Sequence, residues 1–168
     1  AARAESAFRK LLDVNDDYYV LYLQGGATAQ FSMVQMNIAR EGSVVDYINT
    51  GSWATKAILE ARRFCRVNVA ASAEDQNFTY VPGYEDWYLN EDAAYVHVTG
   101  NETIGGVEIH RYPHTNDVPL VADLSSTLLS RPLDGSQFGL LYAGAQKNIG
   151  PAGLTIVVVR KSLTGQAR

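Results

Sequence analysis

Cysteine, basic charge and long hydrophobic runs are all scarce in this chain of 168 residues. The single cysteine, Cys65, excludes an internal disulfide and favours a reducing compartment. The net charge of −4 provides no basic surface of the kind that binds nucleic acid or anionic membranes. No apolar stretch approaches the roughly 20 residues of a membrane-spanning helix. We therefore expect neither nucleic acid nor a membrane as a partner.

Histidine is also rare, and it supports no metal site. His110 and His114 lie in a polar stretch without a cysteine or carboxylate at metal-ligand spacing. His97 alternates with apolar residues in a strand-like run, which is typical of a hydrogen-bonded core histidine rather than of a ligand. We assign no metal.

The chain does contain enough apolar material for one domain. Hydrophobic residues make up 46% of it, which at this length can bury a single core. It begins without methionine in an amphipathic-looking stretch and ends just after a strand-like run. We therefore expect a piece cut from a longer protein.

Short β-branched or aromatic runs, bounded by turn residues, recur along the chain and predict strands. Helical patterns or long connections separate the first six runs, whereas the last two are joined by a connection too short for a parallel crossover. The predicted fold is α/β: a three-layer, doubly wound, mostly parallel seven-stranded sheet with one antiparallel strand. The predicted strands span residues 18–23, 44–49, 66–71, 94–99, 119–123, 138–143 and 154–159.

A glycine-containing turn, Gln24-Gly25-Gly26, joins the first predicted strand to a helix. The first turn of that helix presents free N–H groups and the positive end of the helix dipole, and Thr28 adds a hydroxyl, so the turn could bind an anion. Such turns also occur where they serve only helix–strand packing. We expect the helix to be buried on most sides, because its apolar residues are Phe31, Met33, Val34, Met36 and Ile38.

Three further side chains lie at or just after the ends of predicted strands. Trp53 stands in the first turn of the helix after strand 44–49 and is either a stacking platform or a packing residue. Asp123 ends a buried strand, so it needs a partner for its charge or caps the backbone of the serines that follow it. Lys147 lies in the glycine-rich loop before the last strand, where it is paired, deprotonated, covalently used or simply exposed.

These features come together at one edge of the predicted sheet, because ligands of open α/β sheets bind at the carboxyl ends of the strands. An anion site, an aromatic plate, a threonine (Thr103), an acid and a lysine follow five different strands. A planar, phosphorylated pyridine aldehyde would use all five. The residues therefore indicate pyridoxal 5′-phosphate as a cofactor.

Several motifs make the resemblance specific, and the loop around Lys147, Tyr142-Ala-Gly-Ala-Gln-Lys-Asn-Ile-Gly-Pro-Ala-Gly153, is close to a family signature. The sequence resembles the phosphoserine aminotransferase family, whose members are fold-type-I pyridoxal-phosphate enzymes with an aspartate-aminotransferase-like large domain. The resemblance covers essentially the whole chain. The matching segments are residues 25–31, 46–53, 101–103, 122–126, 130–132 and 142–153.

The resemblance implies catalytic roles for two residues. Lys147 corresponds to the Schiff-base lysine, and Asp123 to the partner of the pyridine nitrogen. Trp53 corresponds to the stacking ring and Thr103 to the donor to the phenolic oxygen of the cofactor. The residues implied to bind the cofactor phosphate are Ala27, Thr28 and Gln146.

The family activity would be amino transfer between L-glutamate and 3-phosphohydroxypyruvate, which yields O-phospho-L-serine and 2-oxoglutarate in serine biosynthesis. The resemblance also implies a cytoplasmic homodimer with its active site at the subunit interface. Residues 1–168 would then be an incomplete large domain, without an N-terminal segment and a C-terminal small domain that carry substrate-binding groups. We expect such a piece alone to be inactive.

Some observations depart from the family pattern or leave alternatives open. Some family members have an arginine at the position of Thr28, so its contribution to substrate phosphate binding is absent here or is supplied elsewhere. Another fold-type-I aminotransferase would share Lys147, Asp123 and the helix start, but not the Gln-Lys-Asn-Ile-Gly-Pro surround. A non-catalytic scaffold domain of the same fold is the third interpretation.

Overall fold

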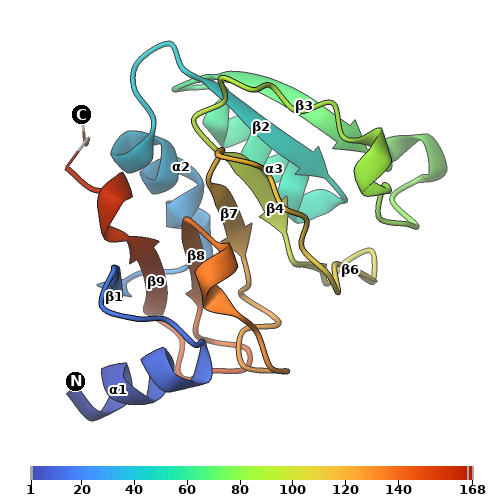
Figure 1. Cartoon of the computed structure of the whole chain (residues 1–168). Helices are drawn as coiled ribbons and strands as arrows, with labels where there is room; N and C mark the ends of the chain where they lie inside the picture. Colours follow the sequence, from blue (N-terminus) through green and yellow to red (C-terminus); the bar gives the residue numbers. More distant parts are fainter. Residues whose placement is uncertain (1, 166, 168) are drawn as a thin grey trace.

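A seven-stranded sheet forms the centre of the computed structural model, which describes residues 2–165 and 167 (Figure 1). The strands lie in the order β1-β9-β8-β7-β4-β2-β3. All seven coincide with predicted strands to within two residues at either end. They are β1 (Tyr18–Gln24), β2 (Val44–Asn49), β3 (Arg66–Ser72), β4 (Val96–Thr99), β7 (Leu120–Asp123), β8 (Leu140–Gly144) and β9 (Leu154–Arg160).

Strand directions also agree with the prediction. Neighbours from β3 through β2, β4 and β7 to β8 pair in parallel. Strand β9 pairs antiparallel with both β8 and β1, so it is the single strand of opposite direction in this sheet. The predicted α/β class, with a mostly parallel seven-stranded sheet and one antiparallel strand, is confirmed.

The two faces of the sheet have separate hydrophobic cores, because alternate strand residues point to opposite sides. On β9, Val157 and Val159 face one core and Val158 faces the other. Helices α2 (Ala27–Ile38) and α3 (Ser52–Ala61) cover the first core. The second core contains residues of the segments that join the strands and is flanked by α1 (Ala2–Leu11), beside β1 in Figure 1. The structure therefore has three layers.

The remaining connections are irregular rather than α-helical. A small hairpin of β5 (Asn101–Glu102) and β6 (Val107–Glu108) follows β4. Four single turns of 3₁₀ helix occur at Glu74–Gln76, Tyr84–Asp86, Gly135–Gln137 and Lys161–Leu163. No helix among the described residues is long and apolar enough to cross a lipid bilayer.

The expected burial of α2 on most sides is wrong. Phe31, Val34 and Ile38 pack against the sheet, but Met33 and Met36 remain 36% and 41% exposed. The buried residues follow the three-to-four spacing of one helix face, and the two methionines lie off that face. The sheet covers a single side of the helix, so the apolar composition of α2 exceeds what the described chain buries.

Candidate active site

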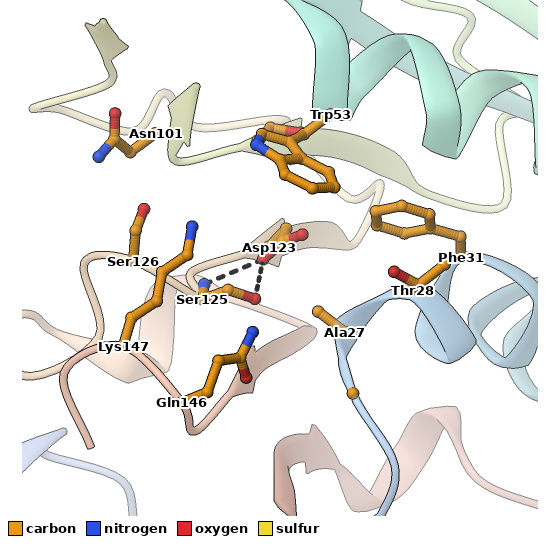
Figure 2. Close-up of a pocket in the computed structure, with 12 residues that line it drawn as sticks. Ala27, Thr28, Phe31, Trp53, Asn101, Asp123, Ser125, Ser126, Gln146 and Lys147 are labelled. Atoms are coloured by element: carbon orange, nitrogen blue, oxygen red, sulfur yellow. Dashed lines mark hydrogen bonds between the residues drawn. The ribbon is translucent and has the colours of Figure 1, made fainter. Parts of the chain in front are cut away.

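A pocket lies at the carboxyl ends of the parallel strands, where the sequence predicts the site (Figure 2). Six of the seven predicted site residues line it: Ala27, Thr28, Trp53, Asp123, Gln146 and Lys147. In Figure 2 the Trp53 ring lies over Asp123, and Lys147 extends toward the space between them. The seventh residue, Thr103, does not line the pocket, but it contacts two residues that do.

Asp123 ends β7 and is only 7% exposed. Its Oδ1 accepts hydrogen bonds from the backbone N–H and the hydroxyl of Ser125, at 2.9 and 2.6 Å. No described residue donates to Oδ2, which leaves that oxygen available to the pocket. Burial raises the pKa of the Asp123 carboxyl, and the Ser125 hydrogen bonds and the Lys147 charge oppose the rise. The capping interaction expected as the plainer alternative is thus present on one oxygen only.

Ser125 also connects Asp123 to the neighbouring strand. Its Oγ accepts a 3.1 Å hydrogen bond from the N–H of Gly144, the last residue of β8. A Cβ at position 144 would lie 2.6 Å from the Gln146 Oε1, so the end of the Gln146 side chain would have to move away. Glycine at this position therefore lets the Gln146 side chain lie close to the end of the strand.

Lys147, Thr103 and Trp53 form a connected group. The Lys147 Nζ and the Trp53 Nε1 each donate to the Thr103 Oγ1, both at 3.2 Å. The Lys147 Nζ lies 5.8 Å from the centre of the Trp53 ring. Because Thr103 accepts both bonds, its own hydroxyl proton remains free to be donated.

The start of α2 supplies N–H groups without partners. Its N-cap, Gly26, makes no side-chain capping bond, and among the described residues the N–H groups of Ala27 and Thr28 have no acceptor. A helix start of this kind attracts anions through its free N–H groups and its dipole. Gln146 approaches this helix start from the other side of the pocket (Figure 2).

A buried layer of rings is formed by Tyr47, Tyr142 and His97, which lies two residues before Thr99 on β4. His97 stacks on Tyr47 with ring centres 4.6 Å apart, and its Nε2 lies 2.9 Å from the Tyr142 hydroxyl. Burial lowers the pKa of His97 to about 3, so the imidazole is neutral at pH 7. This agrees with the prediction of a core histidine, although its Nδ1 has no partner among the described residues.

Comparison with known proteins identifies the family. The model of the aminotransferase class-V family matches residues 1–168. This chain is a class-V aminotransferase domain. It is 58% identical to phosphoserine aminotransferase of Pseudomonas aeruginosa over 168 residues, which are 100% of this chain and 46% of that protein.

Solved structures of the same family have the same fold. Phosphoserine aminotransferase from Bacillus circulans subsp. alkalophilus is 46% identical with a TM-score of 0.95, covering 99% of this chain and 46% of that one. PLP-bound phosphoserine aminotransferase from Trichomonas vaginalis is 38% identical with a TM-score of 0.87, covering 97% of this chain and 46% of that one. The resemblance inferred from the motifs is confirmed, and the class-V aminotransferase chain spans about half the length of the curated relatives it matches.

Several residues that shape the site do not appear among the predicted ones. Ser125 and Ser126 line the pocket directly after Asp123, and Phe31 lines it one helical turn after Ala27. Their positions next to predicted site residues, along the strand end or at helical spacing, were a usable signal. The other pocket residues absent from the prediction are Gly26, Thr99 and Asn101.

Glu102 was also missed, and it lies behind the pocket wall. Its carboxylate is fully buried and accepts hydrogen bonds from the N–H groups of Trp53 and Ala54. Nothing in the local sequence pairs Glu102 with a helix start about 50 residues earlier, so only the fold brings them together.

Proposed function

We propose that the protein transfers an amino group between L-glutamate and 3-phosphohydroxypyruvate, giving O-phospho-L-serine and 2-oxoglutarate in serine biosynthesis. The 58% identity to a phosphoserine aminotransferase along the whole chain carries this proposal. Aspartate, alanine–glyoxylate or other aminotransferases of similar fold share much less of the sequence, between 15% and 17% in three such structures. Their likeness therefore supports the fold alone.

The pocket residues fit pyridoxal 5′-phosphate as the cofactor, and the PLP-bound relative supports it. The pocket combines an amine, a buried carboxylate with a free oxygen, a flat indole and an open helix start. When bound, the cofactor supplies an aldehyde that takes up the amino group and a ring that accepts the electron pair of the broken C–H bond.

Lys147 is proposed to do the covalent and proton-transfer work. Its Nζ would hold the cofactor through the aldehyde in the resting enzyme. It would then remove the proton from the substrate α-carbon as a general base and return a proton as a general acid. Its hydrogen bond to Thr103 supports this role, because it holds the amine at the mouth of the pocket near Trp53.

Asp123 is proposed to hold the ring nitrogen in its protonated state. An ionised, buried carboxylate beside a pyridine nitrogen favours the protonated ring, and its charge is in turn stabilised by that partner. Ser125 would keep the carboxylate in place through Oδ1 while Oδ2 faces the ring. The cost of burying the Asp123 charge would thus be compensated by the ligand.

The remaining residues are proposed to orient the cofactor. Trp53 would stack on its ring, and Thr103 would donate its free hydroxyl proton to the phenolic oxygen. The phosphate would lie at the start of α2. Its proposed binding residues are Ala27, Thr28 and Gln146.

We also propose the wider organisation that the resemblance implies. Residues 1–168 would form an incomplete large domain, completed by an N-terminal segment and a C-terminal small domain. The enzyme would be a cytoplasmic homodimer with its active site at the subunit interface. The coverage of about half of each relative supports the division of the protein into such parts.

The test is an assay of the intact protein with pyridoxal 5′-phosphate, O-phospho-L-serine and 2-oxoglutarate. We expect glutamate and 3-phosphohydroxypyruvate as products, with other amino donors much slower. A preference for aspartate or alanine would indicate another aminotransferase of the same fold. Failure to develop the visible absorbance of a borohydride-sensitive protein-bound cofactor would indicate a non-catalytic scaffold domain. The segment of residues 1–168 alone is expected not to transaminate phosphoserine.

A further inference from the structure

Helix α3 begins against a buried carboxylate that comes from a different element. Glu102, in β5, is 0% exposed. Its Oε2 accepts from the Trp53 N–H at 2.8 Å, and its Oε1 accepts from the Ala54 N–H at 2.7 Å. Each oxygen thus satisfies one of the N–H groups that a helix start leaves without an intrahelical partner. The two bonds fasten the backbone of Trp53 to the hairpin.

The residue after Glu102 fastens the other end of Trp53. The Thr103 Oγ1 accepts the indole N–H at 3.2 Å. A tryptophan side chain has only two rotatable torsions, so holding its backbone and the far edge of its ring defines the plane of the indole. One dipeptide, Glu102-Thr103, therefore contacts Trp53 at both ends.

Gly51 provides the space for the Glu102 carboxylate. A Cβ at position 51 would lie 2.7 Å from the Glu102 Cδ and 2.8 Å from its Cγ and Oε2. The Glu102 side chain is buried and bonded through both oxygens, so it could move aside only by breaking those bonds. Burial raises the pKa of the Glu102 carboxyl, whereas the two N–H groups and the nearby Lys147 and Lys56 oppose that rise.

We propose that Glu102 is a positioning residue that sets the plane of the Trp53 ring at the pocket, and that Gly51 is required to make room for its carboxylate. The importance of that plane for cofactor binding rests on the function proposed above. The orientation of Trp53 itself can be measured without any ligand. The competing explanation is that Glu102 only caps α3 and contributes to stability.

The first variant is Glu102→Gln in the intact protein. Glutamine keeps the shape of the side chain, but it offers one acceptor and turns an N–H₂ group toward the second backbone N–H. We expect the ¹⁹F signal of 5-fluorotryptophan at position 53, assigned with Trp53→Phe, to shift or broaden. We also expect pyridoxal 5′-phosphate to bind about tenfold more weakly, as for the loss of one charged hydrogen bond.

Asp46→Asn is the matched control. Asp46 is also 0% exposed and accepts two hydrogen bonds, from the Asn68 side chain at 2.9 Å and the Asn90 N–H at 2.7 Å. It lies outside the pocket lining and makes no contact with Trp53. We expect this variant to lower the melting temperature, as Glu102→Gln does, but to leave the Trp53 signal and the cofactor affinity unchanged below that temperature.

Gly51→Ala would push the Glu102 carboxylate away from the start of α3, so it should change the Trp53 signal in the same way as Glu102→Gln. Thr103→Val removes the acceptor of the indole N–H together with the Lys147 bond and the proposed donor to the cofactor, so only its ¹⁹F signal tests the indole end if the buried variants do not fold. The proposal is overturned if these variants resemble Asp46→Asn in both readouts. If the unchanged protein binds no pyridoxal 5′-phosphate, the proposed function fails. The ¹⁹F signal then still decides whether Glu102 positions Trp53.

Discussion

Helices α2 and α3 both begin at the same edge of the sheet, each just after a strand and a glycine, but their first turns are used differently. At the start of α2 the N–H groups of Ala27 and Thr28 have no acceptor among the described residues. At the start of α3 the N–H groups of its second and third residues, Trp53 and Ala54, are bonded to the buried Glu102. The same local structure leaves N–H groups free in α2 and is bonded to a side chain of the protein itself in α3.

The difference supports the proposal that a helix start binds an external anion only where the protein does not supply a carboxylate itself. Both helix starts carry a dipole and N–H groups that have no intrahelical acceptor. Glu102 occupies the start of α3, so under the proposed function the cofactor phosphate would lie at the start of α2 and α3 would contribute the Trp53 ring. The following predictions test this division between an anion-binding helix and a ring-holding helix.

The largest effect on transamination is expected from removal of the Lys147 amine, which lines the pocket together with Trp53 and the start of α2. Lys147→Ala in the intact protein should fold but lose transamination by roughly 100- to 10,000-fold, because proton transfer by a positioned side chain contributes that much. Lys56→Ala is the control, since the Lys56 Nζ also lies over the Trp53 ring, at 4.3 Å, but outside the pocket lining. Near-normal turnover of Lys147→Ala would refute the proposed role of the lysine.

A carboxylate introduced at the start of α2 should occupy its free N–H groups, as Glu102 does at the start of α3. Gly26 has φ −147° and ψ 174°, and a Cβ there would meet no atom within 4 Å, so Gly26→Asp is sterically allowed. The added charge should weaken binding of pyridoxal 5′-phosphate by on the order of 100-fold through charge repulsion. Stability should change little, because aspartate and glycine are both acceptable N-caps. Fluorescence titration measures the affinity and urea unfolding the stability.

Gly26→Asn is the neutral control for that variant. Asparagine has nearly the same shape and also caps helices, so it should reduce the affinity far less. Equal affinities of the aspartate and asparagine variants would mean that the phosphate does not lie at the start of α2.

Variants at Asp123 and Ser125 separate the effect of the Asp123 charge from the effect of its hydrogen bonds to Ser125. Asp123→Asn keeps an acceptor for both Ser125 donors but removes the charge. We expect removal of the α-proton of glutamate to slow by about 10- to 100-fold, as for loss of a charged hydrogen bond. Single-turnover absorbance spectroscopy measures this rate. Ser125→Ala, which weakens the cap and keeps the charge, should cost less; the opposite order would make Asp123 a structural cap.

The smallest effect is a change in the pH dependence of stability, and it concerns His97 in the buried layer of rings. Burial lowers the pKa of His97 from 6.5 to about 3, so between these values only the unfolded chain binds the proton. Stability present above pH 6.5 is therefore lost as the pH falls. From pH 6.5 to 5.5 the protein should lose about 1 kcal/mol more unfolding free energy than His97→Gln. Urea unfolding measures this free energy at each pH. An equal loss in both proteins would show that His97 does not cause the acid sensitivity.

Much of the fold could be predicted because its signals are local. The apolar runs around residues 18–23 and 154–159 have strand character in themselves, and the short connection before β9 requires an antiparallel return. The burial of α2 was overestimated, since composition reports which residues are apolar but not how many sides of a helix a neighbour covers. The irregular connections, including the hairpin of β5 and β6, have no hydrophobic periodicity from which their structure could be predicted.

The strands, the antiparallel return and the residues at the strand ends could all be predicted from the sequence, because hydrophobic periodicity and turn residues act over a few positions. The sequence thereby placed Lys147, Asp123 and Trp53 at one edge of the sheet. No local pattern indicates that Glu102 meets the start of α3 while the start of α2 has free N–H groups; the folded chain alone shows it. This difference depends on a contact between residues about 50 positions apart, and such a contact forms only when the sheet brings separate strand ends together.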